Sequence, residues 1–185
     1  MFAEITDKER CIHPITFSSL GFGDDIPYNT LQAMKKIIID SAKNYAVIKF
    51  ARQIVKDVPA KNGIGEVTKI YNFVRDKSRY VKDPYKQELI QTPLVAIDRI
   101  IHGEQFEGDC DDMTVLILSL LKAIGYPVKI ISTSYDAGKN LSHVYGRVLI
   151  QTKLGSKWVV VEPIKLGVPL GWEAPNKTSI VEVNI

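Results

Sequence analysis

The chain has 185 residues and is 45% hydrophobic and 24% charged, which suits one domain with a substantial core. Its formal net charge of +3 is small and its lysines are scattered, so the composition does not indicate a nucleic-acid partner. The longest apolar run, Met113 to Leu121, is too short to cross a bilayer, and the charged N-terminus MFAEITDKER does not resemble a signal peptide.

The first half of the chain is predicted to be helical. Residues 1–29 are expected to form an irregular arm, because GFGDDIPYN is rich in turn formers, and residues 30–185 to form a single domain. Apolar residues recur at helical spacing from Thr30 to about Val58, which predicts one long helix or two consecutive helices. A further helix is predicted from about Gly65 to Ser78. The next segment, YVKDPYKQELIQTP, is predicted to be extended because of its two prolines.

A strongly apolar helix is predicted to begin near Cys110. It is apolar on nearly every side, which indicates burial on nearly every side. Gly125 stands where a left-handed C-terminal cap is favoured, and Pro127 prevents any continuation.

Strands are predicted to follow this helix. The segments VKIISTS, SHVYGRVLIQT and SKWVVVEPI have the β-branched and aromatic content of strands, and SIVEV predicts a terminal edge strand. A short polar connection joins the second and third segments, so we expect them to form an antiparallel hairpin. Helices followed by antiparallel strands predict an α+β fold.

The stretch GDCDD contains a candidate nucleophile. Gly108 and Asp109 provide the turn and the N-cap that begin a helix, which places Cys110 in the first turn. Free N–H groups at that helix end favour a thiolate and can hold a developing oxyanion. The carboxylates of Asp111 and Asp112 stabilise the helix end but oppose ionisation of the thiol, so the thiol needs a cationic partner.

His143 and Glu162 are the candidate partners of this thiol. His143 begins a predicted strand, on the face opposite to Val144, and Glu162 at the end of WVVVEP has the chemistry to orient an imidazole. If the two residues lie directly opposite each other, Ile150 pairs with Gly155 across a four-residue loop.

That register also sets Arg147 opposite Trp158, a plausible cation–π pair, and Tyr145 opposite Val160. A tighter turn centred on Leu154 and Gly155 would instead separate Glu162 from His143 by four positions, roughly 13 Å. Turn chemistry alone does not choose between the two registers. The first is favoured on functional grounds, because it brings Glu162 to His143.

Together these motifs resemble the transglutaminase-like superfamily, relatives of the papain-type cysteine peptidases. The likeness is carried by GDCDD…LLKAIGYP, SHVYGRV and KWVVVEP, and by IYNFVRDKSRYVKDP, which resembles the helix and Tyr-Asp-Pro exit before the cysteine of that superfamily. DP…ELIQTP and PLGWEAP resemble a bacterial and bacteriophage branch. The likeness covers roughly residues 30–175.

The resemblance implies a papain/transglutaminase-like core, in which a buried helix packs on an antiparallel sheet. It implies Cys110 as nucleophile, His143 as general base and Glu162 as orienting acid, although the family most often has aspartate at the last position. The family contains peptidases, amide-forming cross-linkers and non-catalytic members. We expect a peptide or protein substrate, with proteolysis favoured over cross-linking because small stand-alone members lack the extra domains of large cross-linking enzymes.

Other residues have alternative interpretations. Gln91 and Gln105 are candidates for a second oxyanion donor, and Asp112 is a candidate to fix the loop that carries Gln105. Cys110, His143, Glu162, Asp109 and Asp112 also have the chemistry of zinc ligands, but their spacing matches no common zinc motif. Asp109 to Asp112 also lack the glycine and the distal glutamate of an EF-hand calcium loop. We therefore expect neither a metal nor a cofactor.

A non-catalytic role is the competing hypothesis. In that case Cys110 is a small buried residue, His143 a hydrogen-bonded strand histidine, and the protein a peptide-binding or virion assembly component. Cys11 is interpreted as inert and His102 as a loop residue. Tyr80, Tyr145 and Trp172 are interpreted as packing residues. We expect a cytoplasmic or virion-associated protein with no membrane partner; the sequence predicts no oligomeric state.

Overall fold

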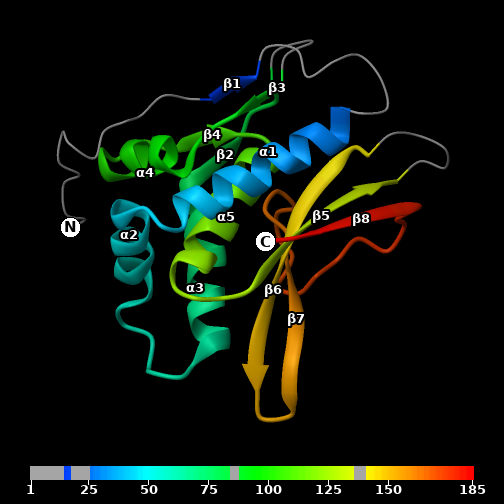
Figure 1. Cartoon of the computed structure of the whole chain (residues 1–185). Coiled ribbons are helices and arrows are strands. Elements are labelled where there is room, and N and C mark those ends of the chain that lie inside the picture. Colours follow the sequence, from blue (N-terminus) through cyan, green and yellow to red (C-terminus); the bar gives the residue numbers. More distant parts are fainter. Residues whose placement is uncertain (1–14, 18–25, 84–87, 136–140) are drawn as a thin grey trace.

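The computed structural model describes residues 15–17, 26–83, 88–135 and 141–185 (Figure 1). The helices are α1 (Ile26–Ser41), α2 (Tyr45–Val55), α3 (Gly63–Lys77), α4 (Pro93–Ile101) and α5 (Cys110–Ala123). The strands are β1 (Ile15–Phe17), β2 (Ser78–Tyr80), β3 (Glu88–Ile90), β4 (Phe106–Gly108), β5 (Val128–Ser134), β6 (His143–Thr152), β7 (Gly155–Val161) and β8 (Ser179–Asn184). The predicted α+β class is therefore confirmed.

Helix α5 is the centre of the fold. Helices α1 to α4 all contact it, and β5 and β6 contact it as well. Every residue from Asp111 to Leu121 is buried. This confirms the burial predicted from the apolar sequence, because a helix without a polar face needs neighbours on all sides. Gly125 has the left-handed φ of 100° expected after the helix end.

The main sheet has four strands in the order β7-β6-β5-β8, and all neighbouring strands are antiparallel. The terminal strand β8 lies at one edge, as predicted, and β7 forms the other edge. Two smaller pairings accompany the sheet. Strands β1 and β3 pair antiparallel, while β2 and β4 pair in parallel and set Tyr80 beside Gly108.

The β6–β7 hairpin is present, but neither register predicted from the sequence is correct. Thr152 pairs with Gly155, so Lys153 and Leu154 form a two-residue turn. Gly155, the residue after this turn, has a φ of 115°, which a glycine adopts readily, and this permits the observed two-residue turn.

The change of register alters the cross-strand neighbours. Arg147 lies opposite Val160 rather than Trp158, and Val160 therefore does not lie opposite Tyr145. The predicted contact between Arg147 and Trp158 is wrong: the cation over the Trp158 ring is the Nζ of Lys129, 4.5 Å from the ring centroid.

The N-terminal helices differ in detail from the prediction. The long periodic segment forms two helices, and the side chain of Asn44 caps the second by accepting from the N–H of Ala46 at 2.9 Å. Helix α1 begins at Ile26, four residues before the predicted Thr30, and β1 lies within the segment expected to be irregular. Cys11 lies outside the described residues. No helix in the described ranges combines the length and hydrophobicity that crossing a membrane requires.

Candidate active site

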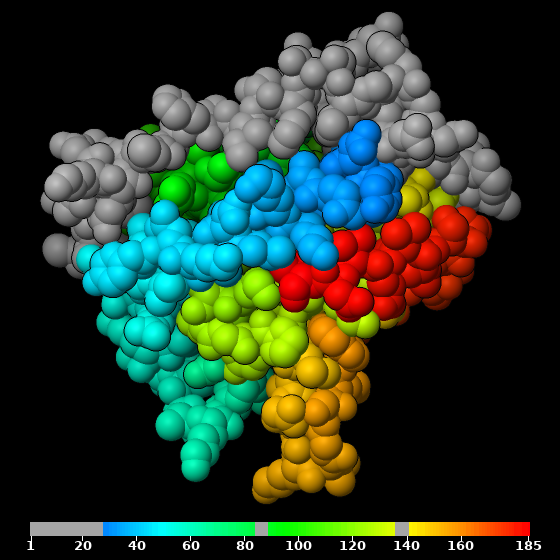
Figure 2. All heavy atoms as spheres, in the orientation of Figure 1, coloured from blue at the N-terminus to red at the C-terminus, as the bar shows by residue number. Residues whose placement is uncertain are grey.

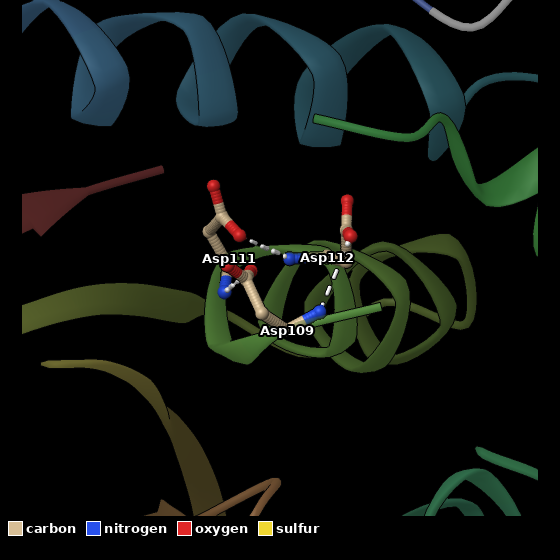
Figure 3. A group of neighbouring side chains, drawn as sticks. All are labelled: Asp109, Asp111 and Asp112. Carbon is tan, nitrogen blue, oxygen red and sulfur yellow. Dashed lines mark hydrogen bonds between the residues drawn. The ribbon is translucent and has the colours of Figure 1, made fainter. Parts of the chain in front are cut away.

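The beginning of α5 is fixed by its own acidic residues (Figure 3). The carboxylate of Asp109 accepts from the N–H of Asp111 at 3.3 Å, and the carboxylate of Asp112 accepts from the N–H of Asp109 at 3.3 Å. This reciprocal capping box defines Cys110 as the first residue of the helix. A Cβ at Gly108 would lie 2.6 Å from the side chain of Asp112, so the closely folded turn requires glycine there.

Asp112 also holds a distant segment against α5. Its two carboxylate oxygens accept from the backbone N–H of Gln91 at 2.6 Å and from Nε2 of Gln91 at 3.1 Å. Burial raises the pKa of Asp112 to about 7, although the hydrogen bonds from Gln91 act in the opposite direction. Asp112 therefore fixes the segment after β3, and not the loop that carries Gln105.

The two candidate oxyanion donors lie in different surroundings. Gln91 donates from Nε2 to the backbone carbonyl of Glu107 at 2.7 Å as well as to Asp112. Its amide thus already has two acceptors. Gln105 is exposed in the connection between α4 and β4. Its role remains a prediction.

The Cys110 thiol is a poor acid in this environment. Burial raises its pKa, and the negative charges of Asp109 and Asp111 raise it further. The backbone N–H groups of Val144 and of Cys110 itself lower it, but they do not compensate. The thiol is therefore protonated near neutral pH, contrary to the expectation that the helix end would favour a thiolate.

The first residues of β6 lie against the first turn of α5. The N–H of Val144 acts on the Cys110 thiol, and the carbonyl of Val144 accepts from Oγ1 of Thr114 at 3.2 Å. Because His143 directly precedes Val144, these contacts bring its strand position next to the thiol.

His143 and Glu162 form a buried pair. Nε2 of His143 lies 2.8 Å from Oε2 of Glu162, and the two residues are 9% and 4% exposed. The other carboxylate oxygen, Oε1, accepts from the backbone N–H groups of Ile164 at 3.1 Å and Lys165 at 3.4 Å. Both oxygens of Glu162 are therefore engaged, and the carboxylate is held in one orientation.

The pair is diagonal rather than directly opposite. Gly146 pairs with Val161, so continuing the ladder by one residue places Tyr145 opposite Glu162 and leaves His143 two positions away on the same face. Diagonal neighbours in a sheet are roughly 7–8 Å apart, a span that longer side chains can cross. The extra methylene of glutamate, relative to aspartate, suits this span.

Aromatic rings enclose the imidazole of His143. The Tyr135 ring stacks at a centroid distance of 6.1 Å and the Tyr145 ring at 5.8 Å, with interplanar angles of 30° and 26°. The hydroxyl of Tyr145 donates to Oε1 of Glu173 at 2.5 Å. Tyr145 thus packs against the candidate base itself, as its position two residues after His143 on the same face of β6 allows.

Glu173 is the charged end of this arrangement. Burial alone would raise its pKa, but hydrogen bonds from Lys177, Tyr145 and Arg147 outweigh burial and lower the pKa to about 2. Sequence reasoning did not identify Tyr135 or Glu173, because their contacts with the site depend on the strand register.

A cluster of carboxylates lies beside the thiol. Oxygens of Asp109, Asp111 and Asp112 all lie within 4.8 Å of one another, close enough to share a cation (Figure 3). In the described part of the chain, no comparable group includes Cys110, His143 or Glu162, so the zinc ligand set weighed from the sequence is not assembled. The three aspartates come from one helix end, where each accepts a backbone N–H.

Comparison with solved structures found similar proteins. Over 73% of this chain and 26% of the other, a candidate protease of Parabacteroides distasonis superposes with a TM-score of 0.52 at 12% identity. For a candidate cysteine protease of Cytophaga hutchinsonii the values are 90% and 54% coverage, a TM-score of 0.46 and 15% identity. LapG of Legionella pneumophila matches over 80% of this chain and 80% of its own, with a TM-score of 0.46 and 17% identity. The chain thus spans about a quarter and about half of the first two proteins.

Comparison with curated protein sequences found no match. Residues 48–163, in contrast, match the family model of the transglutaminase-like superfamily, and this range contains Cys110, His143 and Glu162. The chain belongs to the transglutaminase-like superfamily.

Proposed function

We propose that this protein is a cysteine-dependent hydrolase or acyltransferase that acts on peptide or carboxamide bonds. Cys110 is the nucleophile, His143 the general base and Glu162 the acid that orients the imidazole. The observation that carries the proposal is the 2.8 Å contact between His143 and a carboxylate held on both oxygens, where β6 meets the Cys110 thiol.

The hydrogen bond to Glu162 assigns the two nitrogens of the imidazole. Nε2 carries the proton that is donated to Glu162, so Nδ1 is the nitrogen that accepts a proton from the thiol. Because the thiol rests in its protonated form, it is activated by proton transfer during attack rather than as a preformed thiolate.

The reaction then proceeds through an acyl-enzyme. A bond forms between Sγ of Cys110 and the carbonyl carbon while the thiol proton moves to Nδ1 of His143. Collapse of the tetrahedral intermediate expels the amine, which takes that proton. Water or an acceptor amine attacks the thioester, gives up a proton to His143, and releases the acid or new amide as the thiol re-forms.

The oxyanion is held by the backbone N–H of Cys110 and a second donor. Gln91 can serve as the second donor only by giving up one of its contacts with Glu107 and Asp112. Proteolysis is proposed over cross-linking, with the candidate protease of Parabacteroides distasonis as the supporting relative.

Activity on a protein substrate provides the test. Cys110→Ala should abolish cleavage of casein while leaving the far-UV circular dichroism spectrum and the thermal midpoint unchanged. Unaltered turnover in this variant would refute the assignment of the nucleophile. Casein cleavage is scored by new N-termini and transamidation by incorporation of a fluorescent amine, so the two reactions are separated in one experiment.

A non-catalytic peptide-binding protein, such as a virion assembly component, is the second candidate. The raised pKa of the Cys110 thiol favours it, because an inert buried cysteine has this property. Slow alkylation of Cys110 that is unaffected by His143→Ala would support this candidate over the enzyme.

A further inference from the structure

A groove lies at the turn end of the β6–β7 hairpin, and its lining extends to Arg147 and Glu173, which bond each other beside the candidate active site. Figure 2 shows a notch between this hairpin, in orange, and the connection from α2 to α3, in green-cyan. The groove has a volume of about 1050 Å³. One wall contains residues 61–64 at the beginning of α3, and the other contains residues 157–160 of β7.

The β7 wall presents backbone groups that point away from the sheet. The N–H of Leu149 in β6 donates to the carbonyl of Pro127, so the backbone N–H and carbonyl of Leu149 point toward β5. The backbone groups of the residues on either side of Leu149 in β6 therefore point toward β7. Hydrogen bonds of antiparallel strands alternate in direction, which turns the backbone groups of Lys157 and Val159 toward β6. Those of Ser156 and Trp158 point outward from the edge of the sheet, and Trp158 also lines the groove.

An independent contact supports this alternation. The N–H of Gly171 donates to the outward carbonyl of Val160 at 2.9 Å and covers that end of the edge. Within the described ranges, no backbone group bonds to the outward N–H or carbonyl of Ser156 or Trp158. These four groups form an open strand edge about two residue pairs long.

The groove is positively charged. Lys61, Lys153 and Lys157 line it and are exposed, and none forms an ion pair with a carboxylate of the described residues. The carboxylate in the lining, Glu173, is already bonded to Arg147 and to Lys177. The positive end of the α3 dipole, at Gly63, adds to the potential.

We propose that this groove binds an extended acidic peptide segment, which adds to the edge of β7 as a further strand of the sheet. Its backbone exchanges hydrogen bonds with Ser156 and Trp158. Its alternate side chains on the α3 side meet Lys61 and Lys157, so the groove selects carboxylates at every second position. A second copy of this chain is a poorer occupant, because pairing two β7 edges would bring the Lys153 and Lys157 side chains of both copies together.

Binding is measured with labelled hexapeptides on the Cys110→Ala protein, which removes cleavage from the readout. The (Glu-Val)₃ peptide should bind at least about tenfold more tightly than (Lys-Val)₃. On binding, the outward amides of Ser156 and Trp158 should become protected from hydrogen exchange. The amides of Lys157 and Val159, already bonded to β6, should change little.

Matched variants separate the contributions. Ser156→Pro removes an outward N–H but no hydrogen bond of the β6–β7 ladder, and should weaken binding at least about tenfold relative to Ser156→Ala. Lys157→Glu should weaken binding of (Glu-Val)₃ about tenfold, whereas Lys69→Glu, an equal charge change on an exposed residue of α3, should have little effect. Slow exchange of the Lys157 and Val159 amides shows that each variant keeps its hairpin.

Three results would overturn the proposal: equal affinity for the two peptides, equal affinity of Ser156→Pro and Ser156→Ala, or an equal loss in Lys69→Glu. If the Ser156 and Trp158 amides became protected from hydrogen exchange in the absence of peptide, to an extent that rises with protein concentration, the edge of β7 would be a self-association surface instead. None of these outcomes bears on the catalytic assignment.

Discussion

Glu162 reaches His143 across a diagonal of the β6–β7 hairpin, two residues out of direct opposition, with 2.8 Å between Oε2 and Nε2. The span is bridged because glutamate is one methylene longer than aspartate and because Ile164 and Lys165 hold its other oxygen. The register of the hairpin and the length of the acid are therefore coupled: with the backbone unchanged, an aspartate at position 162 would end about one carbon–carbon bond short of this contact.

Shortening the acid tests this coupling. Glu162→Asp withdraws the carboxylate by about 1.5 Å, the length of one carbon–carbon bond, and should break the contact with His143. We expect kcat/KM for peptide cleavage to fall at least about tenfold, since a loosely held imidazole is a poorer base. A variant with equal or higher activity would show that the diagonal contact does not orient His143.

Neutralising Asp111 should make the thiol more acidic. After burial and the charge of Asp109, the charge of Asp111 raises the pKa of Cys110. In a His143→Ala background, where no base assists, Asp111→Asn should increase the rate of alkylation of Cys110 by iodoacetamide several-fold at pH 8. Asp98→Asn, a change of the same charge on α4, serves as the control and should leave the rate unchanged.

Asp112 should make stability fall as the pH rises. Burial raises its pKa to about 7 in the folded protein, against an ordinary value near 3.9 in the unfolded chain. Between about pH 4 and pH 7 the folded state therefore holds more protons, and this group reduces the free energy of unfolding as pH increases. Asp112→Asn mimics the protonated form and should flatten the dependence. Urea unfolding from pH 4.5 to 7.5 measures the pH dependence of the free energy of unfolding. Parallel curves of this free energy against pH for the unmodified protein and Asp112→Asn would contradict the raised pKa.

Tyr145 is expected to act through its ring more than through its hydroxyl. Tyr145→Phe keeps the ring stacked on His143 but removes the donor to Glu173, which should cost about 1 kcal/mol of unfolding free energy and little activity. Tyr145→Ala removes the ring as well and should lower kcat more than KM changes. Equal activities of the two variants would show that the Tyr145 ring does not position His143.

The parts of the fold that follow from local pattern could be predicted from the sequence. The composition of the sequence predicts helix α5 and strands β5 to β8, and GDCDD combines a turn glycine with an N-cap. Helix α4 was not predicted, because Pro93 was interpreted as a residue that resists helix. Proline at the first helical position is favourable, and Thr92 directly precedes it as the N-cap.

Features that depend on tertiary contacts could not be predicted in the same way. The hairpin register depends on the two-residue turn at Lys153 and Leu154, which the sequence does not specify; the left-handed φ of Gly155, the residue after this turn, is known only from the structure. The contact of Asp112 with Gln91 joins residues 21 positions apart, and no local pattern indicates it. The pKa of the Cys110 thiol depends on how deeply the sulfur is enclosed, which the sequence does not specify.

The dependence of Cys110 reactivity on His143 tests the central claim most directly. In Cys11→Ser protein, which leaves one thiol, alkylation by iodoacetamide at pH 7 is compared between folded and urea-unfolded chains, with and without His143→Ala. We expect the folded protein to react faster than the unfolded one, and His143→Ala to slow the folded protein by roughly a hundredfold or more. A folded protein that reacts slowly, with a rate unaffected by His143→Ala, would contradict the proposed chemistry.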